Sequence, residues 1–242
     1  MIYLTGDVHG GVTIQHISEK NLKPKGIKLT KDDYLIILGD FGFPFLDSEI
    51  NNKHGEYAFW MKWLSEKPYT VLWVDGNHEN FNFWDKQPVT QWHGGNVQIH
   101  PDASNVIRLM RGEIYDIDGN KFFTMGGADS IDKMYRTLNY SWWVQELPSE
   151  EEYANAITNL EKHNYTVDYV LTHCCSSRTQ YKIDRSFARD CMTDWFNDIE
   201  PQLQFKHWYF GHYHIDETID DKHTCLYNEV IELGNTISSD KD

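Results

Sequence analysis

Cysteine is scarce in this chain of 242 residues, which contains only Cys174, Cys175, Cys191 and Cys225. No two of them form a C-x-x-C pair, so their spacing matches neither a zinc ribbon nor the disulfide framework of a small secreted domain. We therefore expect free thiols in a reducing compartment. The adjacent Cys174 and Cys175 are interpreted as small apolar core residues and not as a redox centre.

Long hydrophobic runs are also missing. No apolar stretch of the sequence approaches the roughly 18 residues that a membrane-spanning helix needs. The opening stretch "MIYLTGD" reaches a charged aspartate after a few apolar residues, which is not the pattern of a signal peptide. We expect a soluble, cytoplasmic protein without a membrane partner.

Basic residues are outnumbered by acidic ones. Lys and Arg total 22 against 37 Asp and Glu, which gives a formal net charge of −15. A surface of that sign repels a phosphate backbone and argues against binding of long nucleic acid. A small phosphorylated substrate is still compatible, because bound divalent cations can reverse the charge locally.

Short apolar runs are present, and each stops at a turn signal followed by a polar residue. They lie at residues 1–7, 33–40, 69–74, 167–173 and 206–212. Nearly continuous apolar runs of this length are typical of strands buried on both faces, as in an α/β sandwich.

Helical patterns separate these predicted strands. Residues 55–67 have apolar side chains at helical spacing, and residues 147–163 carry Ser149 as an N-cap followed by acidic residues. A third helix is predicted from Phe187 to Ile199. Residues 105–127 alternate in polarity and contain the turn sequence Asp-Gly-Asn, which predicts an antiparallel hairpin. With no repeat or flexible linker, one domain over residues 1–242 is the simplest organisation.

Residues 127–147 fit neither a strand nor a helix pattern. Their mixture of aromatic and charged side chains predicts either a lid over a substrate site or a surface loop held by tryptophans. Arg136 in this segment, and Arg178 further along the chain, are candidates to bind a substrate phosphate, because a guanidinium can hold phosphate through two hydrogen bonds.

Polar residues follow all five predicted strands at the point where each strand ends. The sequence there reads "GDVHG", "GDFGF", "GNHEN", "THCC" and "GHYH". Ligand sites of α/β sheets gather at the carboxyl ends of strands, and Asp, Asn and His supply oxygen and imidazole donors for metals. Taken singly, Gly-Asp is typical of a turn and a histidine pair of sheet packing. Their recurrence at five strand ends indicates a shared metal site.

This ordered set resembles the calcineurin-like metallophosphoesterase superfamily, in particular its compact bacterial and phage members. The family pattern is D-x-H, G-D, G-N-H-[ED], a lone His and G-H-x-H, and the chain matches it in order from Asp7 to His214. The resemblance implies a four-layer α/β sandwich in which two mixed β-sheets are flanked by helices.

The resemblance also implies a binuclear site for two divalent metal ions. The seven implied ligands are Asp7, His9 and His214 for the first ion, Asn77, His173 and His212 for the second, and Asp40 as the bridge between them. Nitrogen and oxygen ligands do not select one metal, so manganese is expected first, with iron, zinc and nickel as alternatives.

The implied activity is that of a hydrolase acting on phosphate esters. Two ions with two carboxylates leave a positive pocket that suits an anionic phosphate and its transition state. The resemblance implies in-line attack by a metal-bridging hydroxide, with His78 as the general acid that protonates the leaving oxygen. Both a phosphatase and a phosphodiesterase fit this description.

Two alternatives concern the substrate and the chemistry. Protein serine/threonine phosphatases of the superfamily carry Asp-Arg-Gly shortly after the second motif, whereas "GDFGFPFLD" lacks it, which makes a phosphoprotein phosphatase the weaker reading. A catalytically inactive binding scaffold is expected to lack ligands or the general acid. Here every ligand position and His78 are filled, which favours the enzyme.

Overall fold

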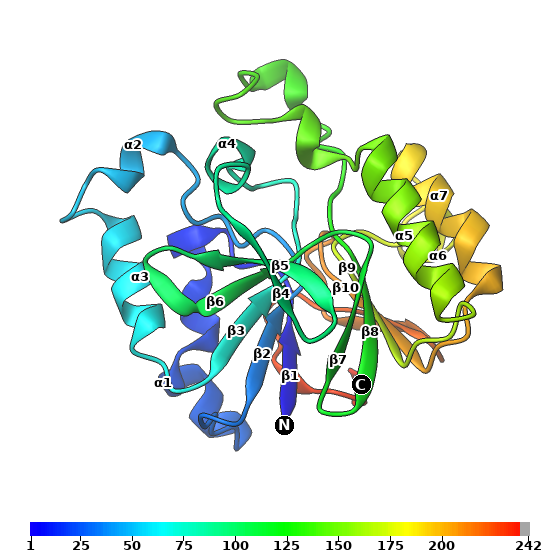
Figure 1. Cartoon of the computed structure of the whole chain (residues 1–242), viewed down its shortest axis with the longest axis horizontal. Coiled ribbons are helices and arrows are strands. Elements are labelled where there is room, and N and C mark those ends of the chain that lie inside the picture. Colours follow the sequence, from blue (N-terminus) through cyan, green and yellow to red (C-terminus); the bar gives the residue numbers. More distant parts are fainter. Residues whose placement is uncertain (238–242) are drawn as a thin grey trace.

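The computed structural model describes residues 1–237 and contains two β-sheets packed face to face, with helices on both outer sides (Figure 1). Each sheet has a core of four parallel strands and antiparallel strands at its edges. The sheets are therefore mixed, as the sequence predicted.

The first sheet has seven strands. Its parallel core consists of β1 (Ile2–Thr5), β2 (Tyr34–Ile37), β3 (Thr70–Trp73) and β6 (Ala103–Leu109). Its antiparallel edges consist of β13 (Ile231–Glu232) beside β1, and of β5 (Gly95–His100) and β4 (Val89–Trp92) beside β6.

The second sheet has six strands. Its parallel core consists of β8 (Asn120–Met125), β9 (Tyr169–Thr172), β10 (His207–Phe210) and β12 (His223–Cys225). Its antiparallel edges are β7 (Glu113–Ile117) beside β8 and β11 (Glu217–Asp220) beside β12.

Helices cover the outer face of each sheet. The α-helices are α1 (Glu19–Leu22), α2 (Asp47–Ile50), α3 (Glu56–Ser65), α4 (Phe81–Trp84), α5 (Glu150–Lys162), α6 (Ser177–Ile183) and α7 (Cys191–Ile199). The 3-10 turns are η1 (Gly10–Val12), η2 (Ile14–Ile17), η3 (Lys23–Lys25), η4 (Lys133–Tyr135), η5 (Val144–Glu146) and η6 (Glu200–Gln202). Helix α3 packs on the first sheet, and helices α5 and α7 pack on the second.

Alternate residues of one strand belong to different hydrophobic cores. In β1, Leu4 lies in the core between the two sheets, whereas Tyr3 lies in the core under α3. In β10, Tyr209 faces the core between the sheets and Trp208 faces α7. Both faces of these strands are buried, which explains their nearly continuous apolar sequence. The four-layer sandwich is confirmed.

The predicted elements match the structure except at two places. The five strands, α3 and α5 are present, and Ser149 caps α5 by accepting a hydrogen bond from the backbone N–H of Glu152 (3.2 Å). The third helix begins later than predicted, at Cys191, because the Asp190 carboxylate accepts the free backbone N–H groups of its first turn.

The hairpin predicted over residues 105–127 is shorter in the structure. Its second part is a hairpin, since β7 and β8 pair antiparallel. Its first residues instead belong to β6 of the first sheet, so the chain crosses from one sheet to the other within this stretch. Within residues 1–237, no helix combines the length and apolar character required to cross a bilayer.

Candidate metal centre

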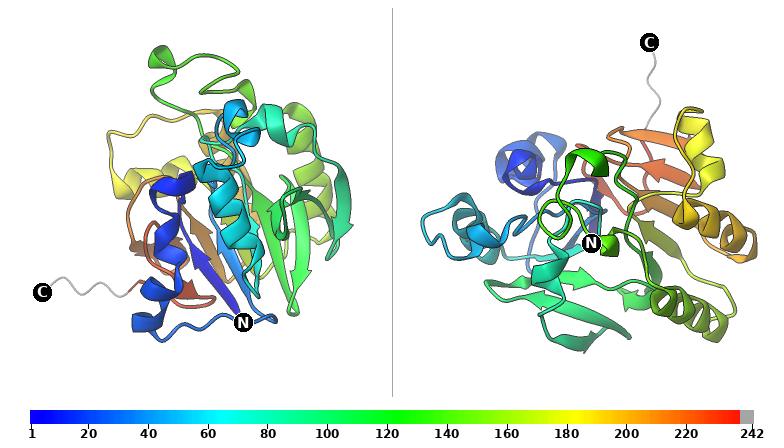
Figure 2. Two further views of the ribbon diagram at one scale, coloured as in Figure 1. Left: turned by 90° about the vertical axis from the view of Figure 1, so that its left-hand side faces the viewer. Right: turned by 90° about the horizontal axis from the view of Figure 1, so that it is seen from above.

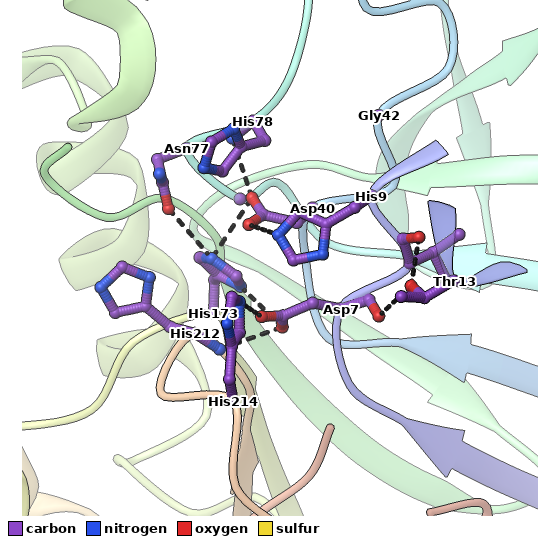
Figure 3. Close-up of polar contacts among 12 residues, drawn as sticks. Asp7, His9, Thr13, Asp40, Gly42, Asn77, His78, His173, His212 and His214 are labelled. Carbon is purple, nitrogen blue, oxygen red and sulfur yellow. Dashed lines mark hydrogen bonds and ion pairs between the residues drawn. The ribbon is translucent and has the colours of Figure 1, made fainter. Parts of the chain in front are cut away.

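The carboxyl ends of five parallel strands position all the predicted ligands. Strands β1, β2 and β3 are neighbours in the first sheet, and β9 and β10 are neighbours in the second. The loops that follow these five strands meet at one end of the sandwich, and their polar side chains converge there (Figure 3). The site is therefore shared by both sheets.

Four of the predicted ligands form a compact group. One donor atom each from Asp7, His9, Asp40 and His214 lies within 4.8 Å of the other three. His9 Nε2 lies 3.1 Å from Asp40 Oδ2, and His214 Nε2 lies 3.0 Å from Asp7 Oδ2. This group comprises the predicted first set and the predicted bridging carboxylate.

His173 joins the rest of the predicted ligands to this group. Its Nδ1 lies 2.7 Å from the backbone oxygen of Leu38 and donates to it, so Nε2 faces the site. That nitrogen lies 3.2 Å from Asn77 Oδ1 and 3.3 Å from Asp40 Oδ1. The Asn77 oxygen is held toward the site because its amide nitrogen donates to Ser130 Oγ (3.0 Å).

The two histidines that flank Tyr213 contact different residues. His214 lies against Asp7, and its ring stacks on Tyr227 with 4.5 Å between centroids. The His212 ring packs edge-on against His173, with 4.9 Å between centroids. Among the described residues, His212 is tied to the carboxylates only through its backbone N–H, which donates to Asp7 Oδ1 (3.0 Å).

Several predicted ligands have an unusual backbone conformation. His9, Asp40, His212 and His214 have φ angles of 47°, 49°, 69° and 52°. Residues other than glycine adopt this left-handed region at a cost, and such residues concentrate at functional sites. Four of the seven predicted ligands share it, which supports a functional role for the cluster.

Glycines before the ligands allow close approach between loops. A Cβ atom on Gly76 would collide with the Asp40 carboxylate, and one on Gly211 would collide with the Asp7 carboxylate. Neither glycine has a positive φ. Their requirement is therefore space for a ligand from another strand, and not a left-handed backbone.

The charge state of the cluster fits a metal site. Burial opposes ionisation of Asp40, but the facing imidazoles of His173 and His9 hold its pKa well below its usual value. Burial works against a charged His173, yet the carboxylates of Asp40 and Asp7 raise its pKa to about 9. The carboxylates of Asp40 and Asp7 therefore stabilise a positive charge placed between them.

A buried carboxylate oxygen of Asp7 gives a second indication that these residues fit a metal ion. Asp7 Oδ2 is buried, and although His214 Nε2 lies 3.0 Å away, no described residue donates a well-directed hydrogen bond to it. A buried carboxylate oxygen without a donor is costly unless a cation occupies its free direction. Together with imidazole and amide donors, it is suited to a divalent cation.

His78 lies beside the cluster, where a proton donor is expected. Its backbone N–H donates to Asp40 Oδ1 (2.8 Å), and its ring packs edge-on against His9 at 5.3 Å. The terminal nitrogens of Arg136 lie 3.3 Å from its two ring nitrogens. Burial lowers the pKa of His78, and the charge of Arg136 acts in the same direction.

Glu79 is a buried residue of the site that the motif assignment left without a role. Its carboxylate accepts hydrogen bonds from the backbone N–H groups of Phe41 (2.8 Å), Gly42 (2.9 Å) and Gly76 (3.1 Å). These bonds join the loop after β2 to the loop after β3. Burial and the charge of Asp40 raise the pKa of Glu79 to about 8. In the sequence, only its position directly after Asn77 and His78 indicated that Glu79 belongs to the site.

The segment 127–147 rises above the ligand-bearing ends of the strands, as both the front view and the view from above show (Figure 1, Figure 2). It contacts the site through Ser130 and Arg136. Trp143 anchors it, because its side chain is buried and packs against Phe45 and Phe81. The segment 127–147 therefore lies over the site and is also held in place by a buried tryptophan.

Arg178, the other candidate for phosphate binding, lies elsewhere. It is exposed on α6, and its backbone N–H donates to Asn197 Oδ1 on α7 (3.1 Å). It lines a surface hollow with Tyr181, Lys182 and Arg185, and none of the predicted ligands lines that hollow. The structure therefore brings Arg136 to the site and leaves Arg178 on another surface.

A family model described as calcineurin-like phosphoesterase matches residues 1–216. The match covers most of the chain, so the chain belongs to this family, as the order of its motifs predicted. It is a metal-dependent phosphoesterase in the general sense that defines the family. A sequence comparison with curated proteins finds no match.

Proposed function

We propose that the protein is a binuclear metal-dependent hydrolase of phosphate esters, with Asp7, His9, Asp40 and His214 as the core of its metal site. The observation that carries the proposal is the grouping of these four donors within 4.8 Å at the ends of strands from both sheets. His173, Asn77 and His212 are proposed to hold the second ion, because His173 Nε2 faces both Asn77 and the shared carboxylate Asp40.

The residues around the metal site have separate proposed roles. When bound, the ions supply Lewis acidity and lower the pKa of a coordinated water. The oxygen of water forms a bond to phosphorus while the bond from phosphorus to the leaving oxygen breaks. His78 gives its proton to that leaving oxygen and is reprotonated from solvent, to which the attacking water releases a proton. Arg136, whose guanidinium contacts His78, is proposed to bind the phosphate oxygens.

The segment 127–147 is proposed to cover the substrate, since Ser130 orients Asn77 and Arg136 contacts His78. Manganese is the first metal to test, with iron, zinc and nickel next, because the N/O donor set accepts all of them. A phosphomonoester and a small phosphodiester are both substrates to test. A phosphoprotein substrate has less support, because the arginine motif of those phosphatases is missing from residues 39–47.

The proposal is tested by removing metal and restoring it. The chelated protein should be inactive on aryl phosphates and bis-aryl phosphodiesters, and Mn²⁺ should restore turnover with two ions per chain. A protein that binds two ions but hydrolyses none of these esters with any of the four metals would instead be a scaffold.

The role of His78 is tested separately. His78→Ala should retain both ions and lose about 10²–10⁴-fold in kcat on an ester with a poor leaving group, because general acid catalysis contributes that much. Esters with good leaving groups should be affected less. Full activity of this variant on the poor leaving group would remove the general-acid assignment, while the exposed His93→Ala serves as control.

A further inference from the structure

A hollow of about 450 Å³ opens beside the metal centre, on the side of the first sheet. His9 and His78 line both this hollow and the metal centre, so the two spaces are continuous. The remaining walls come from η1 after β1, from the loop and helix α2 after β2, and from the start of α3. Its size lies in the range of small-molecule sites, and it is larger than one phosphate group requires.

Aromatic rings form much of the wall. Tyr57 is buried and fixed, because its hydroxyl donates to Asp102 Oδ2 (2.6 Å). Phe45 lies next to the proposed general acid, with 6.2 Å between its centroid and that of His78. Rings fixed in this way offer flat apolar surfaces on which another ring can stack or pack edge-on. The hollow therefore suits a planar aromatic group.

The charged residues of the wall all have one sign. Two carboxylates, Glu49 and Glu56, line the hollow, whereas the described residues that line it include no lysine or arginine. Glu49 is held in place by the backbone N–H of Phe45 (3.1 Å), and Glu56 by the indole N–H of Trp60 (3.3 Å). A negatively charged ligand is repelled by this wall, and a positively charged one is attracted.

The position of His78 determines which part of the substrate enters. A general acid must reach the oxygen that leaves phosphorus, so the leaving group lies next to this imidazole. We propose that the hollow binds the leaving group of the substrate, and that it selects an aromatic leaving group that carries positive charge over one that carries negative charge. This inference rests on the proposed function.

Three aryl phosphates that differ only in a distant charge provide the test. They are 4-(aminomethyl)phenyl, 4-(hydroxymethyl)phenyl and 4-(carboxymethyl)phenyl phosphate, together with their methyl phosphodiesters. The substituents stand beyond a methylene group, so the chemistry at phosphorus stays similar across the series. For the Mn²⁺-loaded protein, kcat/KM should fall from the cationic to the neutral to the anionic ester, with at least about tenfold between the ends.

Variants assign the preference to the wall. The double variant Glu49→Gln, Glu56→Gln should reduce the ratio between the cationic and anionic esters to within about twofold of unity. Glu66→Gln, which removes an exposed carboxylate after the far end of α3, should keep the wild-type ratio. A melting curve checks that the double variant is folded. A double variant that is folded and keeps the full preference overturns the inference.

Binding of the released phenols gives a readout without catalysis. Calorimetry on the metal-free protein should give tighter binding of 4-(aminomethyl)phenol than of 4-hydroxyphenylacetate. Equal kcat/KM for the three esters in the wild type would overturn the inference and leave the proposed function intact. Loss of turnover on all six esters, with two ions bound, would overturn the proposed function and this inference with it.

Discussion

In the outer half of the proposed metal centre, which comprises Asp7, His9 and His214, imidazole nitrogens lie against carboxylate oxygens, and the two histidine side chains are 18% and 49% exposed. In the inner half, which comprises Asn77, His173 and His212, the His173 side chain is fully buried, Asn77 is buried as well, and His212 is partly exposed. The two halves thus differ in access to solvent.

They differ also in what orients their donor atoms. His173 is fixed by a hydrogen bond to Leu38, and Asn77 by one to Ser130. Metal ligands are commonly oriented by such bonds, made by the atoms that do not face the ion. The outer histidines are oriented chiefly by the carboxylates with which they would share an ion. His173 and Asn77 of the inner half are therefore held by other parts of the protein, whereas the outer histidines are held by the carboxylates and, for His214, by stacking on Tyr227.

The largest effect on metal binding and activity is expected at Asp40, the carboxylate that the two halves are proposed to share. Asp40→Asn should reduce binding of both ions and lower kcat/KM by about 10³-fold or more, because loss of Lewis acidity removes several kcal/mol of transition-state stabilisation. Metal analysis and kinetics on one aryl phosphate measure this. Two ions at wild-type affinity would show that the halves do not share this carboxylate. Asp32→Asn, at an exposed position, is the control.

Separate variants then test whether each half holds its own ion. His214→Gln and His173→Gln should each leave about one ion per chain, with kcat/KM lower by about 10²-fold, less than for the shared carboxylate. The ion lost should differ between the two, which competition between Mn²⁺ and Zn²⁺ can reveal. If either substitution releases both ions, the division into halves does not hold.

A chelator should distinguish the halves by rate. Because the outer histidines are partly exposed and His173 is fully buried, excess chelator should remove the ions in two phases, the outer ion first. Stopped-flow measurement of metal release gives both phases. His214→Gln should remove the fast phase alone, while a single phase in the wild-type protein would contradict the difference in access.

The smallest predicted effect is a loss of folding stability at acidic pH. It limits the pH range in which the two halves can be compared. His100 lies outside the site, and burial lowers its pKa from 6.5 to about 4. Its neutral form is therefore favoured in the folded state. As pH falls below 6.5, the unfolded state binds a proton that the folded state does not, so stability decreases until about pH 4. The contribution is at most about 1.4 kcal/mol per pH unit, or about 3 kcal/mol in total.

Denaturant unfolding of the metal-free protein at several pH values measures this loss. His100→Asn should reduce the dependence on pH between 6.5 and 4, whereas the exposed His54→Asn should not change it. An unchanged dependence in His100→Asn would mean that other groups carry the acid sensitivity. Comparisons of the two proposed metal-binding halves are best made above pH 6.5, where His100 contributes no such change.

The sequence predicted most of the fold because the strands are short, apolar and buried on both faces. A strand of that kind needs no distant information to be recognised. The start of α7 was missed because it is set by a single carboxylate cap, that of Asp190, within a longer apolar pattern. The change of sheet after β6 was missed because alternation in sequence does not tell which strand is the partner.

The convergence of the polar residues at the site could be predicted because each motif follows a strand within a few positions, and their assignment as ligands rests on the family resemblance. The residues that support them could not, since their roles depend on contacts far along the chain. Glu79 bonds across 38 positions to Phe41, and Ser130 meets Asn77 across 53. Arg178 was chosen for its residue type alone, and the sequence does not fix which surface an arginine on a short helix faces.

The close approach between glycines and ligands limits where this protein can be redesigned. Gly39, Gly76 and Gly211 each lie against a ligand carried by a different strand, namely His173, Asp40 and Asp7. A side chain at any of these positions would displace a donor atom contributed by another loop. Libraries for directed evolution should therefore keep these three positions constant.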